Sequence, residues 1–438
     1  MKLKHVCSLY GDYGLNISAD EYVEDGVPII RTSDFDDLGR LDLTEPKRVS
    51  ESAASPKMLR RGDILFSRAG TIGRCTTYNR DSPATFAAYL VRFRLIASLV
   101  EPRFIAWWAQ SQQYWSQVRV DTIESTIGNF NAGKLGNLAL PDVPRDEQKA
   151  IADFLDRETA RIDQLIEKKQ RLLEVLNATR VAAPLRVMAS GMGEIEYDAD
   201  HNRINFSNLG EGWQRVRVKH VASHMTSGSR GWSDFIQDDG ELFLQSGSIN
   251  RHMGIAFEDS HRVSPQLGAE AERTKVNNGD TLVCITGGRT GAVGYVSRLS
   301  ERAYINQHVC LIRPSKAIND RLLAQILFSE IGQLHFRMAQ YGLKQGMGFE
   351  QVANTAIPLP PRAAQETISA EIDCIAEKTR RVVEEIDVSI NRLREFRAAL
   401  ITAAVTGQID VTSWGKTGST DRRLDEIEVQ ITNGETVL

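Results

Sequence analysis

The sequence predicts an α+β fold in which two strand-rich α/β modules are separated by two long helices that pair as an antiparallel coiled coil. Three observations lead to this prediction. The second half of the chain repeats landmarks of the first, so that Gly62-Asp63 returns as Gly279-Asp280, 217 positions later. Each half contains short apolar runs between turn residues, and each half then has a long stretch without glycine or proline. Because solenoid units have only about 20–50 residues, the repeat indicates a duplicated module with its own core.

Residues 1–144 form the first predicted module. Strands are expected at residues 27–30, 63–66 and 88–96, where short apolar runs are bounded by turn residues. A single amphipathic helix is expected over residues 104–118, in which aromatic residues recur.

Residues 213–361 form the second predicted module, and its elements follow the same order. Strands are expected at residues 242–244, 280–285 and 309–312, and a helix is expected over residues 321–336. The matching order predicts that the two modules share one fold.

The segments after the modules are predicted to be long helices, at residues 145–188 and 362–408. Apolar residues recur in them at alternating steps of three and four, which is the spacing of a coiled-coil seam. In the first helix the stripe is looser, because Lys169 interrupts it. Two helices with one stripe each most simply pair with each other; packing on a globular core is the alternative. The predicted packing residues are Leu155, Ile162, Leu165, Leu172, Leu176, Ile372, Ile375, Val382, Ile386, Leu393, Phe396 and Leu400.

Two polar segments complete the predicted organisation. Residues 189–212 contain glycine and asparagine, so they are predicted to be a linker that leads into the second module. Residues 409–438 are predicted to be a disordered tail.

Composition sets the broad class of the protein. At 438 residues the chain is longer than one hydrophobic core supports, and its 42% hydrophobic and 25% charged residues are ordinary for a soluble globular protein. No apolar run approaches the roughly 20 residues that span a bilayer, and the first residues lack the core of a signal peptide. The five cysteines are scattered without metal-binding spacing, which favours reduced thiols and a cytoplasmic location.

The net charge of −4 neither favours nor excludes a nucleic-acid partner, because it is a total. Residues 1–150 balance 19 basic against 19 acidic side chains, and residues 211–361 carry 16 against 14. Nearly neutral modules can still carry a basic face.

The apparent catalytic motifs have the wrong spacing for catalysis. A Gly-Lys-Thr tripeptide at residues 415–417 lacks the glycine that a phosphate-binding loop requires five positions earlier, where Asp410 stands. Asp142 and Glu147 mimic a nuclease pattern, but they are too close in sequence for a metal site on two strands, and the second copy lacks both acids. The histidines are isolated, and no metal-binding motif exists. The sequence therefore predicts a chain that is not an enzyme.

The ordered set of motifs resembles the specificity (S) subunit of type I restriction–modification enzymes. Gly62-Asp63-Ile-Leu, then Gly70-Thr-Ile-Gly73, and then Leu140-Pro-x-x-Pro-x-x-x-Gln at the start of a long helix follow one another and recur in the second half. The resemblance covers residues 1–410. It implies two target recognition domains, each reading one half of a split DNA sequence. It also implies that the helices form an antiparallel coiled coil that separates the domains and docks two modification subunits.

Partners and cofactors also follow from the resemblance. Double-stranded DNA with a bipartite target, two modification (methyltransferase) subunits and restriction/motor subunits are the expected partners, without a membrane. No cofactor is expected on this chain: S-adenosylmethionine, ATP and Mg would be bound by the partner subunits. The chain departs from the pattern in two places, because the first module lacks a counterpart to residues 209–213 and the second copy has Ala363-Ala364 in place of Asp146-Glu147.

Candidate DNA-binding residues are the polar side chains in loops and beside strand ends. Arginine and lysine read guanine, and asparagine and glutamine read adenine. The glycine-rich hairpins at residues 69–74 and 287–294 would let the backbone approach phosphate, although a plain hairpin turn explains the glycines equally well. For each single residue, a solvated surface side chain is the alternative. The candidates are Arg31, Ser33, Arg68, Thr71, Arg74, Asn129, Asn131, Lys134, Gln245, Ser248, Asn250, Arg251, Arg289, Thr290, Lys344 and Gln345.

A second class of function competes with DNA recognition. A duplicated scaffold or adaptor with a coiled-coil spacer would show the same repeat without binding DNA. A basic face on both modules would distinguish a DNA reader from such a scaffold.

Overall fold

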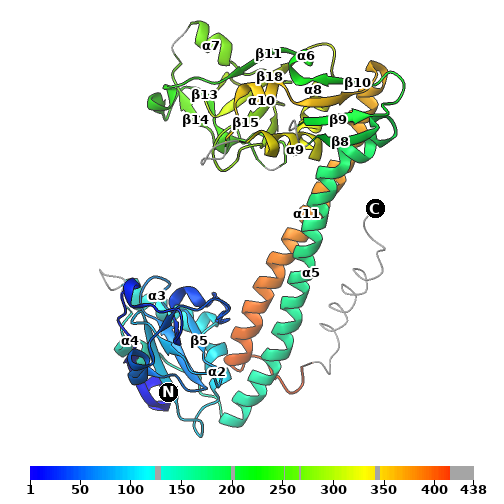
Figure 1. The fold of residues 1–438 in the computed structure, drawn as a ribbon. Helices are drawn as coiled ribbons and strands as arrows, with labels where there is room; N and C mark the ends of the chain where they lie inside the picture. Colours follow the sequence, from blue (N-terminus) through cyan, green and yellow to red (C-terminus); the bar gives the residue numbers. More distant parts are fainter. Residues whose placement is uncertain (124–129, 199–202, 251, 266–267, 341–345, 415–438) are drawn as a thin grey trace. The chain divides into compact units, whose positions relative to one another are not determined.

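The computed structural model describes residues 1–123, 130–198, 203–250, 252–265, 268–340 and 346–414. The chain divides into two compact units, one of Met1–Arg171 with Ile386–Leu438 and the other of Leu172–Glu385. Each unit contains one module and a part of both long helices, which are α5 (Arg145–Met192) and α11 (Arg362–Val405) (Figure 1).

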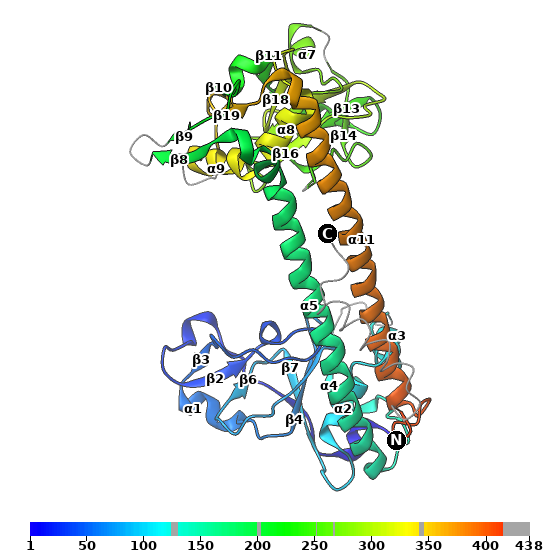
Figure 2. The ribbon, with the colours of Figure 1, turned by 90° about the vertical axis from the view of Figure 1, so that its right-hand side faces the viewer.

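The module of the first unit is built on two sheets. Its strands are β1 (Cys7–Tyr13), β2 (Val27–Ile30), β3 (Arg48–Val49), β4 (Asp63–Ser67), β5 (Cys75–Thr77), β6 (Thr85–Phe86) and β7 (Leu90–Leu95). A four-stranded antiparallel sheet has the order β1-β7-β4-β5, and a three-stranded sheet has the order β3-β2-β6, with β2 parallel to β6 (Figure 2). The helices of the module are α1 (Glu51–Ala54), α2 (Pro102–Trp108), α3 (Gln112–Ile123) and α4 (Ala132–Asn137), with short 3-10 turns η1 (Leu3–Val6), η2 (Ala19–Glu21), η3 (Thr32–Asp34) and η4 (Ser55–Lys57).

The module of the second unit repeats this construction. Its strands are β10 (Gln214–Arg217), β11 (Ala222–Ser227), β12 (Ile236–Gln237), β13 (Glu241–Leu244), β14 (His261–Val263), β15 (Thr281–Cys284), β16 (Val293–Tyr295), β17 (Ala303–Ile305), β18 (Val309–Pro314) and β19 (Ala356–Leu359). Its helices and 3-10 turns are α6 (Val218–Val221), η5 (Trp232–Phe235), η6 (Ser246–Ser248), α7 (Ala269–Thr274), α8 (Asp320–Phe328), α9 (Glu330–Ala339) and α10 (Phe349–Ala353). The sheet β11-β18-β15-β16 matches β1-β7-β4-β5, and β13 is parallel to β17 as β2 is to β6. The predicted repeat is therefore a repeat of topology.

The prediction of a single helix in each module is wrong. In each module the segment forms two helices, and a buried serine lies between them. In the first module Ser111 separates α2 from α3, and its Oγ donates to the carbonyl of Trp108 at 2.7 Å and accepts from the amide of Tyr114 at 3.2 Å. In the second module Ser329 separates α8 from α9 and donates to the carbonyl of Ile326 at 2.7 Å. Such a serine bonds to the carbonyl of the preceding turn and caps the next helix. These hydrogen bonds replace those of a continuous helix, so the helix breaks there.

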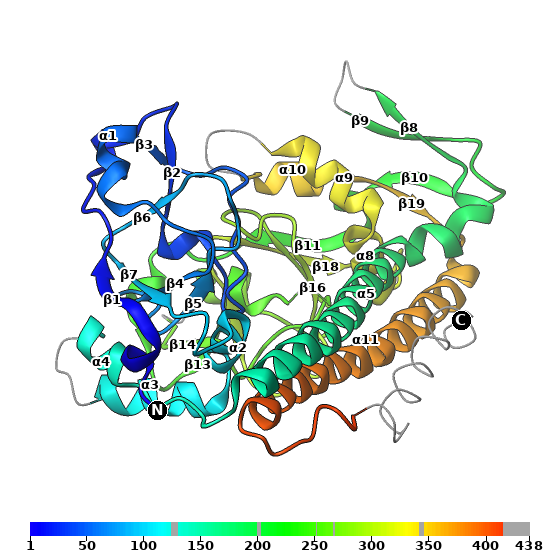
Figure 3. The same ribbon diagram turned by 90° about the horizontal axis from the view of Figure 1, so that it is seen from below.

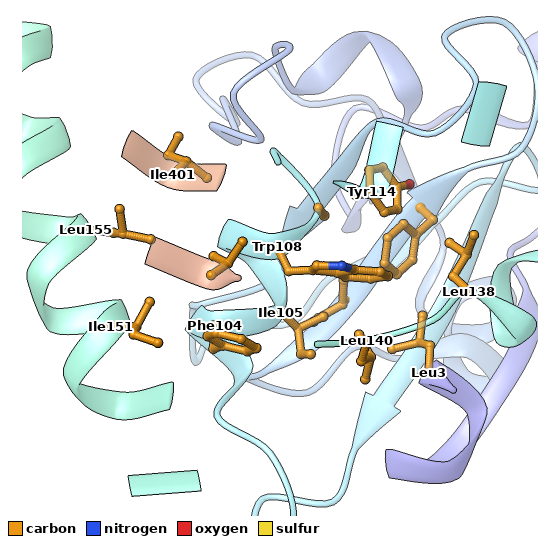
Figure 4. Packing of buried hydrophobic residues seen from close by; sticks show 14 of the residues in the cluster. Leu3, Phe104, Ile105, Trp108, Tyr114, Leu138, Leu140, Ile151, Leu155 and Ile401 are labelled. Carbon is orange, nitrogen blue, oxygen red and sulfur yellow. The ribbon is translucent and has the colours of Figure 1, made fainter. Parts of the chain in front are cut away.

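The long helices pair within each unit. In the first unit the α5 segment of residues 145–171 runs antiparallel to the α11 segment of residues 386–405, and the two lie side by side (Figure 3). Figure 4 shows Leu155 of α5 and Ile401 of α11 beside Phe104 and Trp108 of α2, so the helical seam continues into the core of the module. Among the described residues, no helix is both long and apolar enough to cross a membrane.

The predicted packing residues differ in burial. Those that the structure buries are Leu155, Ile162, Leu165, Leu176, Ile372, Ile386, Leu393 and Leu400. Those that it leaves half-buried are Leu172, Ile375, Val382 and Phe396. The buried stripe of α11 also contains Ile390 and Ile401, which the expected seam omitted.

The predicted linker at residues 189–212 contains regular structure. Helix α5 continues through Pro184 to Met192, and β8 (Glu194–Asp198) then pairs with β9 (Arg203–Ser207) as a hairpin. Met188 and Met192 are buried together with apolar residues of β9, which explains why the helix extends past the polar residues of this segment. Gly193, at φ +70°, ends the helix, and a side chain there would meet the carbonyl of Ser207.

The first residues of the predicted disordered tail have a defined place in the structure. Residues 409–414 pack on the first unit, where Ile409 and Val411 contact its core and the Trp414 ring lies 5.6 Å from the Phe154 ring. Residues 415–438 lie outside the described residues.

The glutamine that opens each long helix holds the module against it. Gln148 is 3% exposed, and its Oε1 accepts from the amide of Glu101 at 3.0 Å while its Nε2 donates to the carbonyl of Val143 at 2.7 Å. Its side chain therefore joins the start of α5 to the loop before α2.

The second module repeats this arrangement at the start of α11. Gln365 is 1% exposed, and its Oε1 accepts from the amide of Asn319 at 2.7 Å. Its Nε2 donates to the carbonyls of Pro360 at 3.0 Å and Ala317 at 3.1 Å. In both modules, the glutamine of the repeated Pro-x-x-x-Gln motif therefore joins two backbone segments through buried hydrogen bonds.

Replacing Gln365 by alanine should lower the free energy of unfolding by about 1–3 kcal/mol, because three buried backbone groups lose their partners. The exposed Gln170 of α5 is the matched control, and Gln170→Ala should change stability by less than about 0.5 kcal/mol. Urea denaturation followed by circular dichroism measures both variants. Equal midpoints for the two would contradict the bridging role.

Candidate nucleic-acid interface

Each module has a loop edge at which three chain segments meet. In the first module these are residues 31–37 after β2, residues 68–74 between β4 and β5, and residues 130–134 around the start of α4. In the second they are residues 245–250 with 252–254, residues 285–291, and residues 346–347. We use the term loop edge for these two sets of residues.

One backbone junction organises both loop edges. In the first module the amide of Arg68 donates to the carbonyl of Tyr89 at 2.9 Å, and the carbonyl of Arg68 accepts from the amide of Phe130 at 3.1 Å. In the second module Ile285 occupies the same place, donating to the carbonyl of His308 at 2.9 Å and accepting from the amide of Met347 at 2.8 Å. Equivalent positions thus carry different side chains on one backbone frame.

The repeated Gly-Asp motif fixes the base of this frame. Asp63 is 1% exposed and pairs with Arg94 of β7 through two bonds of 2.7 Å. Asp280 pairs with Arg313 of β18 in the same way, at 2.9 and 2.8 Å. Burial raises the pKa of Asp280, and the hydrogen bonds from Arg313 oppose that shift. The motif is therefore an internal ion pair between neighbouring strands.

The two candidates after β2, Arg31 and Ser33, both hydrogen-bond to the carboxylate of Asp34. Arg31 Nη2 lies 2.7 Å from Asp34 Oδ1, and the hydroxyl of Ser33 donates to the same oxygen at 3.0 Å. Asp34 is 9% exposed, and its hydrogen bonds raise the pKa of the Arg31 guanidinium. Arg31 therefore keeps its charge, and Asp34 fixes its direction.

The candidates of the first hairpin also have partners inside the module. The guanidinium of Arg68 lies 4.7 Å from the centre of the Tyr13 ring, and Arg74 forms an ion pair with Asp37. The hydroxyl oxygen of Thr71 is buried and has no hydrogen-bond partner among the described residues.

Asn131 and Lys134 meet at the start of α4. The Oδ1 atom of Asn131 caps the helix by accepting from the amide of Lys134 at 2.9 Å, and the Lys134 side chain is half-buried. Asn131 therefore acts first as a helix cap.

In the second module three candidates take part in hydrogen bonds of the turn after β13. The amide of Gln245 donates to the hydroxyl of Ser248 at 3.2 Å, and Asn250 Oδ1 accepts from the amides of His252 at 2.8 Å and Gly254 at 2.9 Å.

The second hairpin is tied to that turn. Arg289 Nη1 donates to the carbonyls of Gly247 at 3.0 Å and Ile249 at 2.8 Å, and the hydroxyl of Thr290 donates to the carbonyl of Gly287 at 2.7 Å. The candidates Asn129, Arg251, Lys344 and Gln345 lie outside the described residues.

Exposed tyrosines in the first module and a half-buried histidine in the second are further candidates that the sequence interpretation did not include. Tyr89 is 64% exposed at the junction, Tyr10 and Tyr13 on β1 are 51% and 36% exposed, and His308 takes the place of Tyr89 in the second module. Tyr89 lies inside an apolar run that predicts a strand, so nothing in the sequence indicates that its side chain is exposed. Such rings suit stacking on sugars or bases at a nucleic-acid surface.

In the described part of the chain, no group of three histidine, cysteine or acidic side chains could hold a metal ion. The five cysteines are free, and burial raises the pKa of Cys310 to about 12, which keeps this thiol protonated at neutral pH.

Fold and loop edges define a class of protein: a chain with two equivalent α+β modules on antiparallel helices. The profile of the type I restriction modification DNA specificity domain matches residues 1–175 and 256–392. The chain belongs to this family.

Several specificity subunits are similar to this chain. That of the type I restriction enzyme EcoKI from Escherichia coli strain K12 is 20% identical over 415 residues, covering 91% of this chain and 85% of the relative. That of StySPI from Salmonella potsdam is 20% identical over 424 residues, with the same coverage of 91% and 85%. That of EcoBI from Escherichia coli is 20% identical over 311 residues, covering 68% of this chain and 64% of the relative, which is just under two thirds of its length.

Solved structures share the fold. A chain from a study of complex assembly and conformational transition of the type I R-M system has a TM-score of 0.65 and 16% identity, covering 93% of this chain and 97% of that chain. The HsdS subunit of Thermoanaerobacter tengcongensis has a TM-score of 0.51 and 16% identity, covering 93% and 96%.

Removing the Arg289 side chain should loosen the turn after β13. Arg289→Ala deletes two charge-assisted bonds, each worth about 1.5–3 kcal/mol, so amide exchange should accelerate in residues 246–254. Hydrogen exchange with mass spectrometry measures this effect. Arg230→Ala, at an exposed position of the same module, is the control and should leave that exchange unchanged. Unaltered exchange in Arg289→Ala would show that the arginine does not hold the turn.

Proposed function

We propose that this chain is the DNA sequence-specificity subunit of a type I restriction–modification complex, in which each module reads one half of a bipartite target. The pair of loop edges is the observation that carries the proposal. Where the first module has Arg68 and Tyr89, the second has Ile285 and His308 on the same backbone junction. A reader of two different half-sites needs one frame with different contact residues, because base edges are distinguished by side chains.

The paired helices are the proposed spacer between the half-sites and the docking element for two modification subunits. A rod of antiparallel helices has a fixed rise of about 1.5 Å per residue, so its length would determine the gap in the target. The buried stripes of α5 and α11 are used within the units, which leaves the flanking polar faces for partner subunits.

The chain is proposed to be non-catalytic and to act in the cytoplasm. In this proposal S-adenosylmethionine is bound by the modification subunits, and ATP and Mg are used by the restriction/motor subunits. The candidate DNA-binding residues are proposed to act as a set at the loop edges, with the exposed tyrosines of β1 and the junction added to them. Family membership disfavours the alternative of a scaffold that never binds DNA.

Mapping of methylated positions in genomic DNA tests the proposed function. Cells that contain the modification subunits should show a bipartite methylated motif when this chain is present and lose it when the chain is removed. An identical methylation map in both would contradict the proposal.

Lengthening both helices should change only the gap of the target. One heptad inserted after Arg171 in α5 and one after Glu385 in α11 adds about 10 Å of helix, which corresponds to about three base pairs. The methylated motif of the variant should keep both half-sites and gain a longer gap. A changed half-site with an unchanged gap would contradict the spacer role.

Exchange of the second module should change only one half-site. A chimaera that carries residues 213–361 of a relative with a different target should keep the half-site read by the first module and the original gap. Sequencing of methylated DNA measures the outcome, and a change in both half-sites would argue against independent readers.

A further inference from the structure

Two arginines of the long helices occupy equivalent places in the repeat and contact the helices of the modules. Arg397 lies on α11 and contacts the first module, whereas Arg180 lies on α5 and contacts the second module. The two residues are 217 positions apart, which is the spacing of the Gly-Asp motif. Each of these arginines therefore reaches its module from the long helix that follows the other module in the sequence.

In the first unit Arg397 joins three elements. Its Nε donates to Asp163 Oδ1 of α5 at 3.0 Å, and its Nη1 donates to Gln110 Oε1 after α2 at 3.3 Å. Its guanidinium lies 5.7 Å from the centre of the Trp107 ring. The side chain is 9% exposed, and Arg40 of the module also pairs with Asp163.

In the second unit Arg180 makes the corresponding contact. Its guanidinium lies 5.6 Å from the centre of the Phe328 ring at the end of α8, and its Nη1 contacts His252 Nδ1. Burial lowers the pKa of both Arg180 and Arg397, so each guanidinium is at least partly removed from water at a cost.

Each module is also held by the helix that follows it. In the first unit Asp156 of α5 pairs with Arg103 at 2.7 Å and accepts from Trp107 Nε1 at 2.9 Å. In the second unit Asp373 of α11 pairs with Arg321 at 2.9 Å and accepts from Gln325 Nε2 at 2.8 Å.

The two kinds of contact together restrict how each module can move on the helices. An aspartate from one long helix and an arginine from the other hold the same module helix, which restricts rotation of the module about either long helix. A leucine would pack on Trp107 or Phe328 without the cost of burying a charge, so stability alone does not account for arginine at both positions.

We propose that Arg397 and Arg180 are positioning residues that fix the orientation of each module on the helix pair and thereby make the complex selective for one gap between half-sites. This inference rests on the proposed function. One extra base pair moves a half-site by about 3.4 Å and turns it by roughly a tenth of a helical turn. A module that is held in one orientation rejects such a displaced half-site, whereas a module that can rotate follows it.

The test compares targets that differ only in the gap. The chain is assembled with its modification subunits, and dissociation constants are measured on duplexes with the native gap and with the gap one base pair longer or shorter. In Arg397→Ala and Arg180→Ala the preference for the native gap should fall by about tenfold, which corresponds to about 1.4 kcal/mol, while the preference for both half-site sequences stays.

Control variants separate positioning from loss of structure. Arg171→Ala and Arg381→Ala remove exposed arginines that pair with Glu167 and Glu377 on their own helices, and both should keep the native preference. Arg397→Lys retains the charge beside Asp163 but loses the planar group over Trp107, so it should remain folded and still accept altered gaps.

Two outcomes would overturn different statements. A wild-type complex that binds no bipartite duplex would refute the proposed function itself. A wild-type complex that prefers one gap, together with Arg397→Ala and Arg180→Ala variants that keep this preference and lose only thermal stability, would refute the positioning role and leave the proposed function intact.

Discussion

The need to bury the apolar stripes of the two long helices is the constraint on which each unit depends. Neither stripe is wide enough to form a core alone, so α5 and α11 cover each other and also extend the core of a module. Leu155 shows the double role, since it belongs to the helical seam and to the cluster around Trp108. The consequence is that a module and its helices fold as one cooperative body, and the helical pair is part of the domain that it supports.

The repeat is preserved most faithfully where module and helix meet. Buried glutamines, capping serines and aspartate–arginine contacts recur at nearly constant spacing, although the loop edges carry different side chains. The glutamine and serine contacts satisfy buried polar groups, which lose much stabilisation when one partner is removed. Exposed positions beside these contacts face no such requirement, so duplication followed by divergence produces a constant frame with variable surfaces.

The sequence allowed the duplicated α+β architecture, the long helices and six of the strands to be predicted, because these depend on periodicity and on turn residues. It did not allow the break at Ser111 to be predicted, since a serine inside an apolar pattern is neutral until its hydroxyl finds a carbonyl one turn back. The hairpin after Met192 was missed because its apolar residues are dispersed among polar ones. At the candidate interface the sequence selected residues in loops, and the structure brings these loops together within each module. The sequence could not show that the side chain of Asn250 holds its own turn, nor that Tyr89 is exposed.

The loop edges close on themselves through local hydrogen bonds, and this has a consequence for how the protein can change. Asp34 and Asn250 stabilise their turns from within, so the neighbouring exposed positions contribute little to the folding free energy. Substitutions at those positions can therefore accumulate without unfolding the sheet beneath them. Under the proposed function, a lineage of such chains could explore new target sequences while its helices continue to fit the same partner subunits. Contacts that must stay constant for assembly would then be separate from positions that are free to vary for recognition.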